Sequence, residues 1–168
     1  MSPATGKRAG IEMYAAGDAP ALQETSMMSM PTVDPAAADQ FREWASSSGH
    51  VVKVLYEQGG ESGMSLVWSW FGAGYVLPRH SHNADCLYYV LAGEARLGNR
   101  TVPAGSGFFV PTDAPYAYTA GPDGVQVLEF RSVSSFDMKI TESVARWDQI
   151  ASIVRTHDEA WKATRVDG

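Results

Sequence analysis

The chain has a single cysteine among its 168 residues and contains no long apolar segment. With Cys86 alone, no disulfide can form within the chain, which is compatible with a reducing compartment. No segment approaches the roughly 20 consecutive apolar residues that a membrane-spanning helix needs. The opening Met1–Gly10 is not followed by the apolar stretch of a secretory signal. We therefore expect a cytoplasmic protein without a membrane partner.

Basic residues are also scarce. The chain has 13 Lys and Arg against 19 Asp and Glu, which gives a net charge of −6 and an isoelectric point near 5.1. The basic residues form no run anywhere in the sequence. Because a surface that follows phosphates needs clustered positive charge, nucleic acid is not an expected partner.

The remaining composition is that of a turn-rich globular chain, with 45% hydrophobic residues, 16 Gly and 9 Pro. The length suits one domain with one core. We divide the chain into a partly disordered arm at 1–32, a short helix at 33–49, a β-rich domain at 50–141 and a C-terminal helix at 142–168. The short helix is indicated by Asp34 as N-cap and Pro35 in the first turn.

The region from His50 to Arg131 consists of short β-rich runs separated by Gly, Pro and Asn turns. It contains seven or eight such runs and no helical pattern between them. This arrangement favours an antiparallel sandwich or small barrel over a parallel sheet.

The C-terminal segment is amphipathic. Its apolar residues recur at spacings of three and four, at Trp147, Ile150, Val154, His157 and Trp161. We expect this helix to pack on the outside of the β-domain or on a second subunit. An open alternative is that the helix at 144–164 makes the protein a partner-binding module.

One segment carries the chemistry: Gly74-x5-His80-x-His82-x3-Cys86-x6-Gly93. Side chains alternate along a strand, so two histidines one residue apart point to the same face and can converge on one metal. Neutral imidazoles suit Zn, Fe, Ni or Cu. The two glycines are expected at strand ends, where turns are needed.

This segment resembles the first cupin motif, Gly-x5-His-x-His-x3-Glu-x6-Gly, with Cys86 in the place of the glutamate. The second cupin motif, Gly-x5-Pro-x-Gly-x2-His-x3-Asn, maps onto Gly105-x5-Pro111-x-Asp113-x2-Tyr116-x3-Ala120. Here Tyr116 replaces the histidine and Ala120 the asparagine. The resemblance covers about Met64–Arg131 and implies an all-β antiparallel cupin (jelly-roll) β-barrel, flanked here by the N-terminal and C-terminal helices. It also implies a homodimer formed by strand exchange or sheet stacking.

The resemblance further implies a divalent metal (Zn, Fe, Ni or Mn) held by three histidines and a glutamate. Only His80 and His82 of that set are present, and the other two positions offer Tyr116 as a phenolate and Cys86 as a thiolate. Some cupins, the thiol dioxygenases, carry a cysteine that cross-links to a tyrosine, but they keep the third histidine. The alternative is that all four residues only form hydrogen bonds or line a cavity.

Aromatic residues on the same strands are candidates for a cavity lining: Trp68, Trp70, Tyr88 and Tyr118. If these faces turn inward, they suit a small, largely apolar or aromatic molecule. Charge near a barrel mouth could come from Arg79, Glu129 and Arg131, although Arg79 should point away from His80.

Two functions therefore stay open. The first is a metal-dependent enzyme of dioxygenase, isomerase or lyase type, acting on a small organic molecule. The second is a non-catalytic cupin that binds or senses a small molecule with a degenerate metal site.

Overall fold

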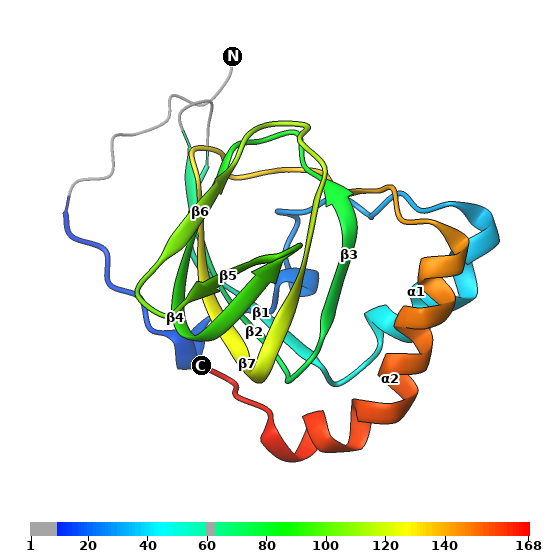
Figure 1. The fold of residues 1–168 in the computed structure, drawn as a ribbon. Coiled ribbons are helices and arrows are strands. Elements are labelled where there is room, and N and C mark those ends of the chain that lie inside the picture. Colours follow the sequence, from blue (N-terminus) through cyan, green and yellow to red (C-terminus); the bar gives the residue numbers. More distant parts are fainter. Residues whose placement is uncertain (1–9, 60–62) are drawn as a thin grey trace.

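The computed structural model describes residues 10–59 and 63–168, in which a curled antiparallel sheet is flanked on one side by two helices (Figure 1). The pairings between the named strands are all antiparallel. This confirms the predicted all-β antiparallel architecture. The strands are β1 (His50–Gln58), β2 (Met64–Phe71), β3 (Val76–Ser81), β4 (Cys86–Leu97), β5 (Arg100–Pro103), β6 (Gly107–Val110), β7 (Tyr116–Arg131) and β8 (Lys139–Ile140).

The long strand β7 organises the sheet. Strand order runs β1-β2-β7-β3-β8, and β4 pairs with β5, β6 and β7. The first part of β7 lies beside β3, so that Tyr116 is opposite His80. Its last part lies between β2 and β4, so that Glu129 is opposite both Val67 and Tyr88. Residues far apart in the sequence therefore meet on one inner face.

The two glycines of the histidine motif both adopt the left-handed backbone conformation, with φ of 69° at Gly74 and 68° at Gly93. Gly74 precedes β3, as expected. Gly93 does not end a strand, because β4 continues past it to Leu97. The register shifts there between Gly93 and Ala95, and a Cβ at Gly93 would lie 2.1 Å from the carbonyl oxygen of Gly124. A close backbone approach at a bulge, not a turn, requires this glycine.

The N-terminal helix begins as the residues indicate. The Asp34 side chain accepts the N–H of Ala36, and the 3-10 turn η3 (Pro35–Ala37) leads into α1 (Ala38–Ala45). The C-terminal helix α2 (Val144–Thr164) is capped by Ser143, whose hydroxyl accepts the N–H of Arg146. In the described ranges, no helix has the length and apolarity needed to cross a membrane.

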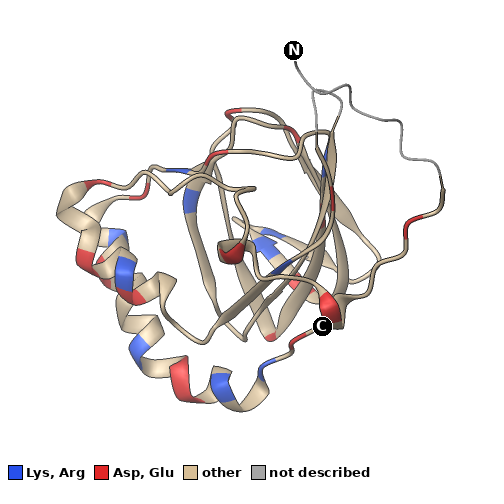
Figure 2. Ribbon diagram, turned by 180° about the vertical axis from the view of Figure 1, so that it is seen from behind, with Lys and Arg blue, Asp and Glu red and all other residues tan. Residues whose placement is uncertain are grey.

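The helices α1 and α2 pack on each other beside β3 (Figure 1). The apolar face of α2 is buried within the chain, since its residues Trp147, Ile150, Val154 and Trp161 are at most 5% exposed. The outer side carries charges of both signs (Figure 2), including a bidentate pair between Arg155 and Glu43 that joins the helices. The helix therefore packs its apolar face against its own chain.

The N-terminal segment, for which we expect a partly disordered arm, runs along the barrel from Gly10 onward. It contains the 3-10 turns η1 (Ala16–Asp18) and η2 (Leu22–Glu24). The Pro20 carbonyl accepts the N–H of Val54 at 3.0 Å, and the Ser29 N–H donates to the Phe136 carbonyl at 3.0 Å. Met27 is buried, so apolar contact as well as hydrogen bonding holds the segment. Residues 1–9 of the predicted arm and residues 60–62 lie outside the described part.

Candidate functional site

His80 and His82 lie together inside the barrel. Their side chains are 1% and 7% exposed, and their ring centres are 4.9 Å apart. His80 is at the end of β3 and His82 directly follows it. The alternation of the strand thus brings both imidazoles to the same face.

The backbone fixes the orientation of both rings. Nδ1 of His80 is 2.7 Å from the Pro78 carbonyl oxygen, and Nδ1 of His82 is 2.5 Å from that of Asp137. A carbonyl only accepts, so each Nδ1 donates and each Nε2 carries the lone pair. Burial, followed by the charge of its neighbour His82, lowers the pKa of His80 to about 3. Burial also lowers the pKa of His82, with Arg131 as the next cause. Both imidazoles are therefore neutral near pH 7.

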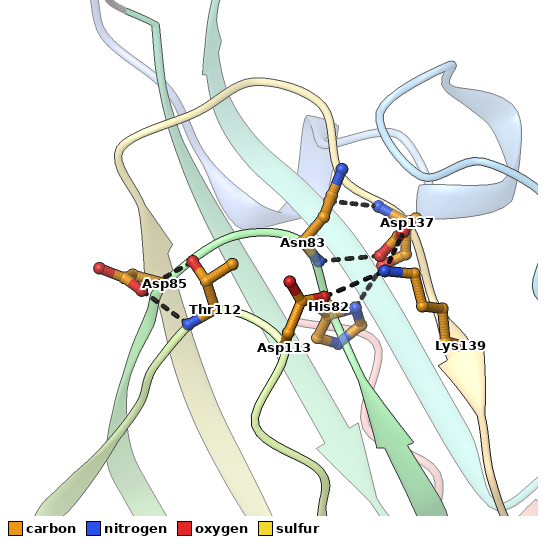
Figure 3. A network of polar contacts seen from close by, with 7 residues as sticks. All are labelled: His82, Asn83, Asp85, Thr112, Asp113, Asp137 and Lys139. Atoms are coloured by element: carbon orange, nitrogen blue, oxygen red, sulfur yellow. Dashed lines mark hydrogen bonds and ion pairs between the residues drawn. The ribbon is translucent and has the colours of Figure 1, made fainter.

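A polar network holds Asp137, the residue whose carbonyl accepts the hydrogen bond of His82 (Figure 3). Asn83 and Asp137 bond reciprocally, each accepting the other's backbone N–H through its side chain, at 2.8 and 2.9 Å. Lys139 bridges the carboxylates of Asp137 and Asp113 at 3.3 and 3.0 Å. Asp137, whose carbonyl orients His82, is thus held by both Asn83 and Lys139.

Asp113 has a left-handed backbone conformation. It follows Pro111 by two residues, at the position where the second motif that this sequence resembles has glycine. Its φ is 59°, and it is the one non-glycine residue with positive φ in the described ranges. Its N–H donates to the His82 carbonyl at 2.8 Å. The left-handed turn that favours glycine is therefore kept here by an aspartate, which tolerates it better than most residues.

Tyr116 lies directly against the histidine pair. Its ring centre is 4.3 Å from that of His80 and 6.2 Å from that of His82. Its hydroxyl is hydrogen-bonded to the hydroxyl of Tyr88. Burial, followed by the charge of Glu129, raises the pKa of Tyr116 above its ordinary value, so the residue is a neutral phenol near pH 7.

Cys86 also faces the interior, 1% exposed at the start of β4. Burial raises the pKa of its thiol to about 12, so it is protonated near pH 7. Nowhere in residues 10–59 and 63–168 do three His, Cys, Asp or Glu side chains gather closely enough to hold a metal ion. Asp85, one residue earlier, instead accepts the N–H and hydroxyl of Thr112 (Figure 3).

The predicted aromatic lining divides between two faces. Tyr88 and Tyr118 are 2% and 3% exposed and lie inside the barrel with Tyr116, with ring centres 5.9 and 6.5 Å from it.

Trp68 and Trp70, contrary to expectation, lie on the other face of β2. They are opposite Leu128 and Gln126 of β7, whereas Ser69 between them is opposite Val127. Opposed residues on neighbouring strands share a face, so the inner face of β2 carries the odd-numbered residues. The tryptophans are still buried because the C-terminal tail covers them, with Val166 near Trp70 and Gly168 near Trp68.

Glu129 and Arg131 lie inside the barrel, deeper than the mouth position that the sequence suggested. Arg131 is 1% exposed, and its Nη2 donates to Glu129 Oε2 at 2.8 Å. The second carboxylate oxygen of Glu129 accepts the hydroxyl of Ser69 at 2.9 Å. Alternation with the buried Val125 and Val127 on β7 is the signal that places both on the inner face. Arg79 is exposed and takes no part in this cluster.

No family model and no curated protein matches this sequence. Solved structures do resemble the fold. They include KdgF from Halomonas sp. (22% identity over 52% of this chain and 82% of that chain, TM-score 0.44) and an RmlC-like cupin from Shewanella frigidimarina (23% identity, 51% and 78%, TM-score 0.43). An oxalate decarboxylase from Bacillus subtilis is similar over 55% of this chain but only 29% of its own length (17% identity, TM-score 0.45). Each of these likenesses covers about half of this chain.

Proposed function

We propose that the chain binds a small organic molecule inside the barrel and acts on it as a metal-dependent enzyme of dioxygenase, isomerase or lyase type. The observation that carries this proposal is the orientation of the two buried histidines. Each donates its Nδ1 proton to a backbone carbonyl and keeps a neutral Nε2 as a potential ligand. Metal-binding histidines are commonly held in this way by a second hydrogen bond.

The residues present fit a divalent metal at two positions. His80 and His82 would hold it through Nε2, and the phenol of Tyr116, whose ring centre is 4.3 Å from that of His80, would offer an oxygen ligand. A bound divalent metal supplies a Lewis acid that polarises a carbonyl oxygen or binds oxygen. With two protein nitrogens, coordination positions stay open for a substrate. Tyr88 keeps the Tyr116 hydroxyl in place through their mutual hydrogen bond.

Metal analysis of purified protein and of single variants tests the proposal. We expect one equivalent of metal in the native protein and a loss of metal in His80→Ala and in His82→Ala. His157→Ala is the matched control, because this histidine lies on α2 and its Nδ1 bonds to the Ile153 carbonyl. Metal content that is unchanged in His80→Ala would overturn the metal site.

The alternative is a non-catalytic cupin that binds or senses a small molecule. It is favoured by the two replaced ligand positions, where Tyr116 and Cys86 are both protonated near pH 7. In that case a ligand would raise the melting temperature equally with and without a chelator, since ligand binding to the folded state alone stabilises it. A drop in melting temperature on adding the chelator would count against this alternative.

We also propose a homodimer formed by sheet stacking. The outer sheet face, as we call it, is the exposed side of β4, β6 and β7, and it carries large apolar side chains that are 42–57% exposed: Leu87, Tyr89, Leu91, Phe109 and Phe130. The register makes it contiguous, because Leu87 is opposite both Phe109 and Phe130. A contiguous apolar face of this kind fits a second copy of the chain better than a charged partner.

A further inference from the structure

Arg131 is a buried cation with an incomplete set of partners. It stands at the end of β7, and Glu129 two residues earlier on the same strand face accepts one hydrogen bond from its Nη2. The Nε and Nη1 atoms are buried and have no acceptor among the described residues. These two nitrogens carry three of the five N–H donors of a guanidinium.

A neighbouring hydroxyl is also without a partner. Ser65 is opposite Arg131 across β2 and β7, is fully buried, and its Oγ has no hydrogen bond in the described part of the chain. Buried polar groups in folded proteins are nearly always paired, because an unpaired donor loses its bonds to water without replacement. Donors gathered on one inner face therefore point to an acceptor that residues 10–59 and 63–168 do not supply.

The guanidinium lies close to the histidine pair. Its Cζ is 4.0 Å from the ring centre of Phe136, and the same ring meets His82 edge-on at 5.2 Å. The Cζ atom and the His82 ring centre are thus at most about 9 Å apart, the sum of these two distances.

We propose that Arg131 anchors the carboxylate of a small organic acid, whose other end lies against His80 and His82. This inference rests on the proposed function, because the proposed metal site is what places the other end of the acid at His80 and His82. A charged donor set selects an anion over a neutral oxygen, because charge-assisted hydrogen bonds are about twice as strong. Glu129 beside the guanidinium disfavours a doubly charged phosphate, since like charges at close range repel. A planar group with a single negative charge matches the donors that remain unpaired on Nε and Nη1 of Arg131.

A second pair in the chain has the same spacing without the same consequence. Glu94 and Arg96 on β4 are also two residues apart and are joined at 2.6 Å. Arg96 is 51% exposed, so water satisfies its remaining donors. This pair is the matched control for the buried one.

Binding of simple acids tests the anchor directly. The probes are lactate, malonate, succinate and glutarate, each compared with its neutral amide at the same concentration and ionic strength. Thermal shift and titration calorimetry are run on the native protein, Arg131→Lys and Arg96→Lys, before and after chelator treatment. We expect at least one acid, and no amide, to raise the melting temperature of the native protein and of Arg96→Lys. Arg131→Lys keeps the charge but loses the fork of donors, and its affinity should fall about ten- to hundred-fold.

Glu129→Gln keeps the test decisive if Arg131→Lys does not fold. The guanidinium then loses its negative neighbour, so the free protein should be less stable and the shift produced by the acid larger than in the native protein. Equal shifts with acids and amides, no shift with any acid, or equal acid binding in native and Arg131→Lys protein would each overturn the anchor. So would an unchanged or smaller shift in Glu129→Gln.

The anchor and the metal site can fail separately. Acid binding that survives chelation and depends on Arg131 supports the anchor even if no metal is bound at His80. Metal binding at His80 and His82 without acid binding would leave the proposed metal site intact and remove the anchor.

Discussion

His80 and Tyr116 face each other across β3 and β7 with their ring centres 4.3 Å apart, at the position where the cupin motif would place two histidines. Tyr116→Phe keeps the ring and removes the hydroxyl. If the phenol is a ligand in the native protein, Tyr116→Phe should bind metal more weakly than the native chain. Competition titration with a colorimetric chelator measures the change. A Tyr116→Phe protein that binds metal as tightly as the native chain would show that the Tyr116 hydroxyl does not reach the metal.

Asp113 allows the backbone of the second motif to be tested separately from its chemistry. Both Asp113→Gly and Asp113→Ala remove the carboxylate that pairs with Lys139 at 3.0 Å. They differ in how they tolerate a φ of 59°. We expect the glycine variant to have the higher free energy of unfolding, by about 1 kcal/mol, since an L-residue with a Cβ is strained there. Urea denaturation of the two variants measures it, and equal stability would mean that the turn rearranges.

The sequence predicted the antiparallel barrel and the meeting of His80 with His82 because both follow from local rules, strand alternation and turn spacing. It could not decide which face of β2 is the inner one. Trp68 and Ser69 lie on opposite faces and both are buried, since the C-terminal tail covers the outer side of the strand. The sequence alone likewise suggested that Arg131 lies near a barrel mouth. The pairing of β7 with β2 and β4 places it inside.

His50 is expected to make stability depend on pH. It stacks on Trp44 at 6.0 Å, and its Nδ1 is bonded to the Tyr75 hydroxyl at 3.1 Å. Burial, and then the charge of Arg165, lowers its pKa from 6.5 to about 4. As the pH falls below 6.5, His50 takes up a proton in the unfolded chain but not in the folded protein, so stability decreases until about pH 4. For this group alone the loss is at most about 3 kcal/mol.

The variant His50→Gln isolates this contribution. His80, with a pKa of about 3, destabilises the protein in the same direction and is unchanged in the variant. Between about pH 7 and pH 4.5 the variant should therefore lose less stability than the native protein in urea denaturation. Parallel pH dependence of the two proteins would show that His50 is not buried as described.

The outer sheet face is expected to form the contact between the two subunits of a dimer. Leu87 is 53% exposed and lies between Phe109 and Phe130 in the register, so Leu87→Glu places a charge at the centre of that face. Burying an unpaired carboxylate costs several kcal/mol, enough to dissociate a dimer of ordinary size. We expect the native protein to sediment as a dimer and Leu87→Glu as a monomer. Val144→Glu is the control, because Val144 is a 39% exposed apolar residue at the start of α2, outside that face. A native protein that stays monomeric at high concentration, or a Leu87→Glu dimer, would exclude stacking through this face. Dissociation by Val144→Glu instead would place the subunit contact at the helices.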